Sequence, residues 1–270
     1  MVNTKTSPRP PRVPGNQSKH RNRPTKRHGA NKHRPITQNK IQPKLRIMVM
    51  GGLEEVGRNM TVLEYGDDIV IIDMGLQFPE ENMPGIDYII PDITYLETRA
   101  KNIRGVVITH GHYDHIGAIS HLCPKLGNPT IYTAPLTAEL VKRRHEEYKT
   151  TPLVIQKIAP DKDKIQLGKF SVEFFRVTHS IPDSFGVVVN TPVGTVVHTG
   201  DFKIDFNPVN DKPMDLSRVA QIGARGVLAL LSDSTDAPHS GYQLSETEIT
   251  GDLEKIFLQA HGRIIVGPFA

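Results

Sequence analysis

Four residues of types that commonly bind metals lie within six positions of this 270-residue chain. His110, His112, Asp114 and His115 follow the apolar run 106–108. A short apolar run bounded by turn residues is typical of a buried strand, and loops after such strands often carry functional residues. Imidazole and carboxylate ligands together suit zinc or manganese. Two neighbouring ions can bind the attacking and the leaving oxygen of a displacement reaction at phosphorus. Two ions close together could share these ligands, with His110 and His112 on one and Asp114 and His115 on the other.

Three further polar residues come just after apolar segments of the chain. Asp73 follows residues 69–72, His179 follows 174–177, and Asp201 lies shortly after 195–197. Taken singly, each could serve in a turn or as a cap, and the histidines could be incidental surface residues. Their repetition beside the first cluster predicts one metal site that is built by the ends of several strands.

These residues resemble the four sequence motifs of the metallo-β-lactamase superfamily. The neighbouring segments are similar to the bacterial ribonuclease J family, in the β-CASP branch of that superfamily. The segments that carry this similarity are GGLEEVGRNM at 51–60, THSIPDS at 178–184 and HTGDFK at 198–203. The resemblance extends from about Lys44 to Ala270.

The resemblance implies two divalent ions, with zinc expected and manganese or magnesium as alternatives. It assigns His110, His112 and His179 to the first ion, Asp114 and His115 to the second, and Asp201 to a bridge between them. Asp73 would orient one of the ligands, as outer carboxylates commonly do. Asp114 and Asp201 would act in the hydrolysis of RNA, with Asp114 assisting proton transfer. A metal-bound water ionises near pH 7, so such a site has a nucleophile at neutral pH.

Asp233 resembles the acidic motif with which the β-CASP segment begins, and this implies a third catalytic carboxylate. The alternative is a helix cap or a turn. The two later histidine motifs of that branch do not occur before Ala270. We therefore expect the chain to be the N-terminal portion of a longer protein. We also expect its second metal to bind less tightly than its first, and RNA cleavage by this chain alone to be weak.

The first part of the chain differs sharply in charge from the rest. Residues 1–46 contain 13 of the 33 lysines and arginines and none of the 29 acidic residues. Seven prolines and few apolar side chains in this segment predict a disordered basic tail over 1–43. Such tails bind nucleic acids through their phosphates, so we predict RNA as the partner, with a merely solubilising tail as the alternative.

The body of the chain alternates strand-like and helix-like segments. Strands are expected near 45–50, 60–65, 69–73, 104–109, 130–133, 164–167, 171–178, 185–190, 194–199, 226–231 and 262–266, and helices near 115–123, 135–148, 215–221 and 246–260. Sheets with helices outside them predict an α/β fold, and the resemblance makes it an αββα sandwich. We expect a metallo-β-lactamase domain at 44–231 and the beginning of a β-CASP segment at 232–270.

Two other functions stay open at this point: hydrolysis of a thioester or lactam on the same fold, and RNA binding without catalysis. No apolar run approaches the roughly 20 residues that span a bilayer, and no secretory signal follows the basic segment. The single cysteine, Cys123, excludes an internal disulfide and is typical of a reducing compartment. We expect a cytoplasmic protein without a membrane partner, and a homo-oligomer is left open.

Overall fold

The computed structural model describes residues 43–209 and 211–267 of the chain. All of these belong to one compact unit, Gln42–Ala270. The predicted disordered basic tail lies outside the described residues except for Pro43. The boundary expected between 231 and 232 stays a prediction, because the unit is not divided there.

The first sheet of the described residues has six strands in the order β1-β2-β3-β4-β5-β6. Its strands are β1 (Leu45–Gly51), β2 (Met60–Tyr65), β3 (Asp68–Ile72), β4 (Ile103–Val107), β5 (Ile131–Thr133) and β6 (Ile155–Lys157). The first three pair antiparallel, whereas β3 to β6 run parallel. Every residue of β2 and β3 is buried, as expected for strands that are covered on both faces.

The second sheet has five strands in the order β11-β10-β9-β8-β7. Its strands are β7 (Lys164–Leu167), β8 (Phe170–Arg176), β9 (Phe185–Thr191), β10 (Gly194–His198) and β11 (Ala229–Leu231). The first four form the antiparallel meander that the sequence predicts, and β11 joins β10 in parallel. A turn after Thr191 links β9 to β10, where the Thr191 hydroxyl donates a 2.7 Å hydrogen bond to the Gly194 carbonyl.

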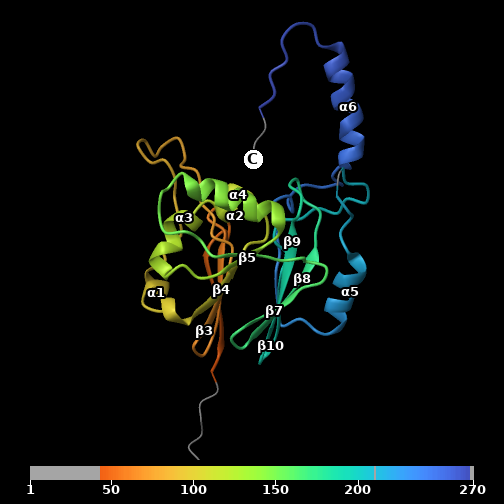
Figure 1. The fold of residues 1–270 in the computed structure, drawn as a ribbon. Helices are drawn as coiled ribbons and strands as arrows, with labels where there is room; N and C mark the ends of the chain where they lie inside the picture. The colour runs from red at the N-terminus through yellow and green to blue at the C-terminus, as the bar shows by residue number, and fades with distance from the viewer. Residues whose placement is uncertain (1–42, 210, 268–270) are drawn as a thin grey trace, which may run out of the picture. The chain divides into compact units, whose positions relative to one another are not determined.

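The helices lie on the outer faces of the two sheets, except α6, which projects away from the sandwich (Figure 1). They are α1 (Thr94–Glu97), α2 (Tyr113–Ile116), α3 (Ile119–Leu122), α4 (Pro135–Glu146), α5 (Leu216–Ala224) and α6 (Glu246–Gln259), with two 3₁₀ turns at Ala100–Asn102 and Pro124–Leu126. Three hydrophobic clusters separate the layers. One packs α1, α3 and α4 against the first sheet, one fills the space between the sheets, and one packs α5 against the second sheet. This is the predicted αββα order of layers.

Several details differ from the expectation, among them the helix α1, which was not predicted. The strand expected at 262–266 is absent from the described residues, where this segment is irregular and exposed. The helix expected over 115–123 is split into α2 and α3, because Gly117 and Ala118 connect two short turns there. Strand β6 was not predicted, since its three residues are too short to show a period. In the described part of the chain, no helix has the length and apolar character that crossing a membrane requires.

Candidate metal centre

The predicted site residues gather at one edge of the sandwich, because their strands end there. Asp73 and His110 follow β3 and β4, which are parallel neighbours. His179 and Asp201 follow β8 and β10, which both pair antiparallel with β9 and therefore run in the same direction. Each of the two sheets thus contributes polar residues just beyond its carboxyl-terminal strand ends, and the structure brings the predicted residues of both sheets together at one edge.

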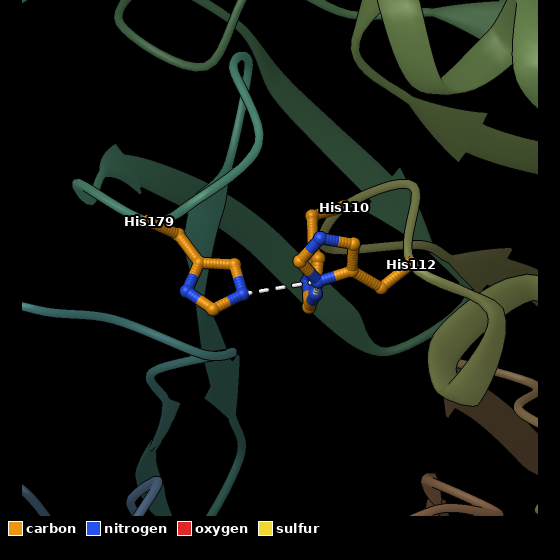
Figure 2. A group of neighbouring side chains, drawn as sticks. All are labelled: His110, His112 and His179. Atoms are coloured by element: carbon orange, nitrogen blue, oxygen red, sulfur yellow. Dashed lines mark hydrogen bonds between the residues drawn. The ribbon is translucent and has the colours of Figure 1, made fainter. Parts of the chain in front are cut away.

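Three histidines converge on one point. His112 Nδ1 lies 3.1 Å from His110 Nε2 and 3.1 Å from His179 Nε2. Each pair of imidazole rings is 4.8 Å apart between centroids, and all three interplanar angles exceed 70°. Figure 2 shows His179 reaching across from its own loop to the other two rings. Their ligand nitrogens form one of the two clusters of potential metal ligands among the described residues.

Asp73 orients two of the histidines, one of them through a threonine. Its Oδ2 lies 2.8 Å from His115 Nδ1 and accepts a 2.9 Å hydrogen bond from the Thr109 hydroxyl. Because that hydroxyl donates its only proton to Asp73, it must accept from His110 Nδ1, 3.0 Å away. Both rings therefore direct Nε2 into the site. Asp73 thus lies behind these two rings, and its role in metal binding stays a prediction.

His115 belongs to the second cluster, together with His110 and Asp201. Its Nε2 lies 3.4 Å from Asp201 Oδ1 and 3.4 Å from Asp114 Oδ2. Asp201 also faces the first cluster, since its Oδ2 is 3.9 Å from His179 Nε2. The position of Asp201 between the two clusters is the one expected of a bridging ligand. Asp114 lies beside the second cluster without belonging to it.

The protonation of these groups follows from burial and from their neighbours. Burial and the nearby imidazoles lower the pKa of His110 well below its ordinary value. Burial also lowers the pKa of His112 and of His179. Burial opposes charge on His115 as well, but the carboxylates around it raise its pKa well above the ordinary value. The three-histidine cluster is thus neutral at pH 7 and able to donate lone pairs to a cation.

The chemistry of this donor set fits divalent metal ions. His112 Nδ1 lies 3.1 Å from a nitrogen of each of the other two imidazoles, and protons shared among three neutral rings cannot satisfy all of these nitrogens. Tetrahedral zinc with bonds of 2.0–2.1 Å would place such nitrogens about 3.3 Å apart, so only a small expansion is needed. The carboxylates of Asp114 and Asp201, with pKa values held low by His115 despite burial, supply negative charge beside them.

Asp233 adopts the turn role that was its alternative interpretation. Its Oδ1 accepts from the backbone nitrogen of Thr235 at 2.9 Å and from the Thr235 hydroxyl at 2.7 Å. Its Oδ2 lies 3.4 Å from the backbone nitrogen of Phe202, the residue after Asp201. Asp233 is therefore near the site, and its catalytic role stays a prediction.

A hollow of about 850 Å³ adjoins this side of the centre. Phe202 and Asp233 line it, together with the exposed aromatic residues Phe206 and Tyr242. The hollow is large enough for part of a polymeric substrate, and its aromatic side chains offer flat apolar faces.

Asn59 is a polar residue of the site for which the sequence analysis predicted no role. Its amide nitrogen Nδ2 lies 3.2 Å from Asp114 Oδ2 and 3.1 Å from His115 Nε2. Asn59 belongs to the segment 51–60 that carries the family resemblance. An asparagine is not a typical ligand in such motifs, so only its position in space reveals its connection to the site.

Comparisons with known proteins agree with this geometry. A family model described as the metallo-beta-lactamase superfamily matches residues 53–261. Ribonuclease J from Thermus thermophilus is 45% identical over 236 residues, which are 85% of this chain and 41% of that protein. Ribonuclease J from Synechocystis is 42% identical, covering 87% of this chain and 37% of that protein. Ribonuclease J2 from Bacillus subtilis is 40% identical, and the match covers 84% of this chain and 40% of that protein.

The chain spans about two fifths of the length of these relatives. Among solved structures, a protein of unknown function from Enterococcus faecalis matches with a TM-score of 0.59 at 16% identity. That match covers 80% of this chain and 57% of the other, and at this identity it supports the fold alone.

Proposed function

This chain belongs to the metallo-beta-lactamase superfamily, and we propose that it hydrolyses RNA phosphodiester bonds as a metal-dependent ribonuclease of the ribonuclease J type. The observation that carries the proposal is the convergence of three imidazole nitrogens beside two carboxylates. The names of relatives at 40–45% identity support RNA as the substrate. They do not favour the thioester or lactam alternative. Cleavage from an end and cleavage within the strand both stay open.

The residues divide naturally between two cations. The first would be held by His110, His112 and His179, the second by Asp114 and His115, with Asp201 between them. Imidazole with carboxylate favours zinc, and manganese or magnesium is the alternative. When bound, the cations would neutralise charge on the phosphate and activate water for attack.

The side chains around the cations have separate tasks. Asp73 fixes the His115 and His110 rings so that Nε2 of each faces the site. Asn59 occupies Oδ2 of Asp114, which leaves Oδ1 of Asp114 to accept and return a proton. Asp233 contacts the backbone nitrogen of Phe202, the residue after Asp201, and would act from there as the third catalytic carboxylate.

Two features would bind the rest of the RNA. Phe206 and Tyr242 line the hollow beside the centre, and exposed aromatic faces stack well on single-stranded bases. Residues 1–46 add 13 basic side chains without any acidic one. We expect this basic segment to attract phosphate over a distance. We further assign residues 232–270 to the beginning of a β-CASP segment and the protein to the cytoplasm.

The test is single-turnover cleavage of a 5′-monophosphorylated RNA by metal-free protein to which zinc or manganese is added. We expect cleavage only with metal, and its loss in His112→Ala. The matched control is His239→Ala, since the His239 side chain is 80% exposed and lies outside both ligand clusters. Equal cleavage by wild type and His112→Ala would reject the proposal. Hydrolysis of a thioester or lactam without cleavage of RNA would replace it with the alternative.

The basic segment is tested separately, by deleting residues 1–43. RNA binding should weaken, and the slope of log affinity against log salt should become shallower as fewer counterions are released. An unchanged slope would show that the segment only adds solubility.

A further inference from the structure

The loop between β1 and β2 has a backbone conformation that a simple connection would not require. Antiparallel neighbours can be joined by two residues. Here Glu54 and Arg58 have φ of 58° and 54°, and Gly52 and Gly57 have φ of 88° and 106°. Left-handed conformations cost about 1 kcal/mol or more for residues with a side chain, and they persist where the surroundings enforce them. The shape of this loop therefore serves something beyond connecting two strands.

Internal contacts stabilise the loop in this shape. Glu55 Oε1 accepts a 3.0 Å hydrogen bond from the backbone nitrogen of Gly52. Glu55 also forms an ion pair with Arg58, which holds the pKa of the Glu55 carboxyl below its usual range. The two ends of the loop are thus tied together directly before Asn59.

The backbone of Asn59 is fixed from both sides. Its nitrogen donates to the Asp114 carbonyl at 3.0 Å, and its own carbonyl accepts from Gly75 at 2.9 Å. A Cβ atom on Gly75 would lie 1.5 Å from the Asp114 carbonyl oxygen and 2.8 Å from the Asn59 nitrogen. Only glycine allows the three segments to approach this closely. Asn59 therefore has a position defined relative to Asp114.

The side chain of Asn59 is enclosed as well. A Cβ atom on Gly52 would lie 2.2 Å from Asn59 Oδ1, so that side of the amide packs directly against the Gly52 backbone. The other side directs Nδ2 to Asp114 Oδ2 at 3.2 Å and to His115 Nε2 at 3.1 Å. An amide nitrogen donates and a carboxylate oxygen accepts, so this contact fixes the rotation of the Asp114 carboxylate.

We propose that Asn59 is a positioning residue for the second cation, and that the β1–β2 loop is shaped to deliver it. Asn59 Nδ2 lies against both Asp114 Oδ2 and His115 Nε2, and it thereby fixes how this carboxylate and this ring face the second cation. The three-histidine cluster does not depend on it, because none of those histidines contacts Asn59 in the described part of the chain. The inference rests on the two-cation part of the proposed function and needs neither RNA nor catalysis.

The test is a stepwise cobalt titration of metal-free protein, followed by visible absorption and by calorimetry. In Asn59→Leu, which keeps the number and branching of the side-chain heavy atoms and removes the donor, the second cobalt should bind about 10–100-fold more weakly, as is typical for loss of an outer hydrogen-bond partner. Affinity for the first cobalt should be unchanged. Asn59→Ser keeps a donor on a shorter side chain and should lose less affinity than Asn59→Leu.

The matched control is Asn190→Leu. Asn190 Nδ2 donates to Glu173 Oε1 at 3.1 Å, the same kind of contact in the second sheet, and its loss should change neither binding step. Equal weakening of both steps in Asn59→Leu would indicate a general structural role and overturn the inference. Unchanged affinity for both the first and the second cobalt in Asn59→Leu would overturn the inference too. A wild-type protein that binds only one cobalt would overturn the two-cation part of the proposed function and this inference with it.

Discussion

Two charged clusters of this protein show opposite ways of arranging polar side chains. On the second sheet, Glu173 of β8 accepts from Lys164 and Arg225 at 3.1 Å each and from Arg218 at 2.5 Å. At the sheet edge, three histidines direct ring nitrogens towards one another. The first cluster satisfies its carboxylate with cations of the same chain. The second brings together nitrogen and carboxylate donors from both sheets.

The difference separates a structural cluster from a binding site. Both are largely buried and both shift pKa values. Burial would raise the pKa of Glu173, yet its cationic partners lower it to about 2. In the histidine cluster, burial and mutual repulsion also lower the pKa of His110, but for an imidazole this favours the neutral form. A perturbed pKa alone therefore does not identify function. Function is indicated by the direction in which the lone pairs point and by the groups that they contact.

The largest contrast is expected from His112→Ala. Zinc affinity of the first site should fall by more than about 100-fold, because a direct ligand contributes more than an outer partner, whose loss costs 10–100-fold. The stability of the metal-free protein should stay within about 0.5 kcal/mol, since His112 is only half-buried and its loss relieves crowding. Competition with a chelator and thermal unfolding without metal measure the two quantities. Unchanged zinc affinity would contradict the division between the clusters.

Asp73→Asn should weaken metal binding by about 10–100-fold. The amide cannot orient His115 as an anionic acceptor, so Nε2 of that ring is no longer held towards the site. The matched control is Asp68→Asn, at the start of β3, the strand that Asp73 follows. Asp68 forms an ion pair with Arg104, with a distance of 2.5 Å between Asp68 Oδ1 and Arg104 Nε, at the end of the strand away from the histidines. The control should alter stability without altering metal affinity, and equal effects on metal in both variants would show that β3 acts only as a scaffold.

Glu173→Gln should produce the reverse pattern, with lower stability and unchanged metal affinity at pH 7. We expect the free energy of unfolding to fall by about 1–3 kcal/mol. Because the folded-state pKa of Glu173 is about 2 against an ordinary 4.5, its stabilisation is present above pH 4.5 and is lost as pH falls towards 2. Unfolding curves of wild type and variant should therefore converge over that range of pH. Curves that stay parallel would show that another group causes the acid sensitivity.

The smallest effect is expected from Arg225→Ala. The Arg225 side chain is 45% exposed, and two other cations still pair with Glu173. Exposed ion pairs contribute about 0.2–1 kcal/mol, so the free energy of unfolding of the variant should be lower than that of wild type by no more than this. A larger loss in chemical denaturation would mean that the Glu173 cluster depends on all three cations together.

The fold was largely predictable because its core strands are strongly apolar. Segments 60–65 and 69–73 are apolar enough to predict the strands that became β2 and β3. The alternation of strands and a turn at 191–194 predicted the meander. Strand β6 and the absence of a strand at 262–266 were missed. Short segments have too few residues to establish a period, and their conformation depends on the neighbours available to pair with.

The site was partly predictable for a different reason. His110, His112, Asp114 and His115 are close in sequence, so chemistry alone identifies them. The role of Asp233 could not be decided, since a carboxylate after a strand serves equally well in a turn, and the structure gives it turn hydrogen bonds with Thr235.

What the sequence determined by itself was the set of donors and the strands that carry them. Spacing within one loop places ligands together whatever the rest of the fold does. Only the tertiary structure decided which donors share a point, which carboxylate lies between the two clusters, and that Asn59 reaches Asp114 across 55 positions. The Glu173 cluster was equally hidden, because Arg218 and Arg225 lie 45 and 52 positions from it. Contacts between distant segments depend on how the sheets and loops pack, and no local pattern records that.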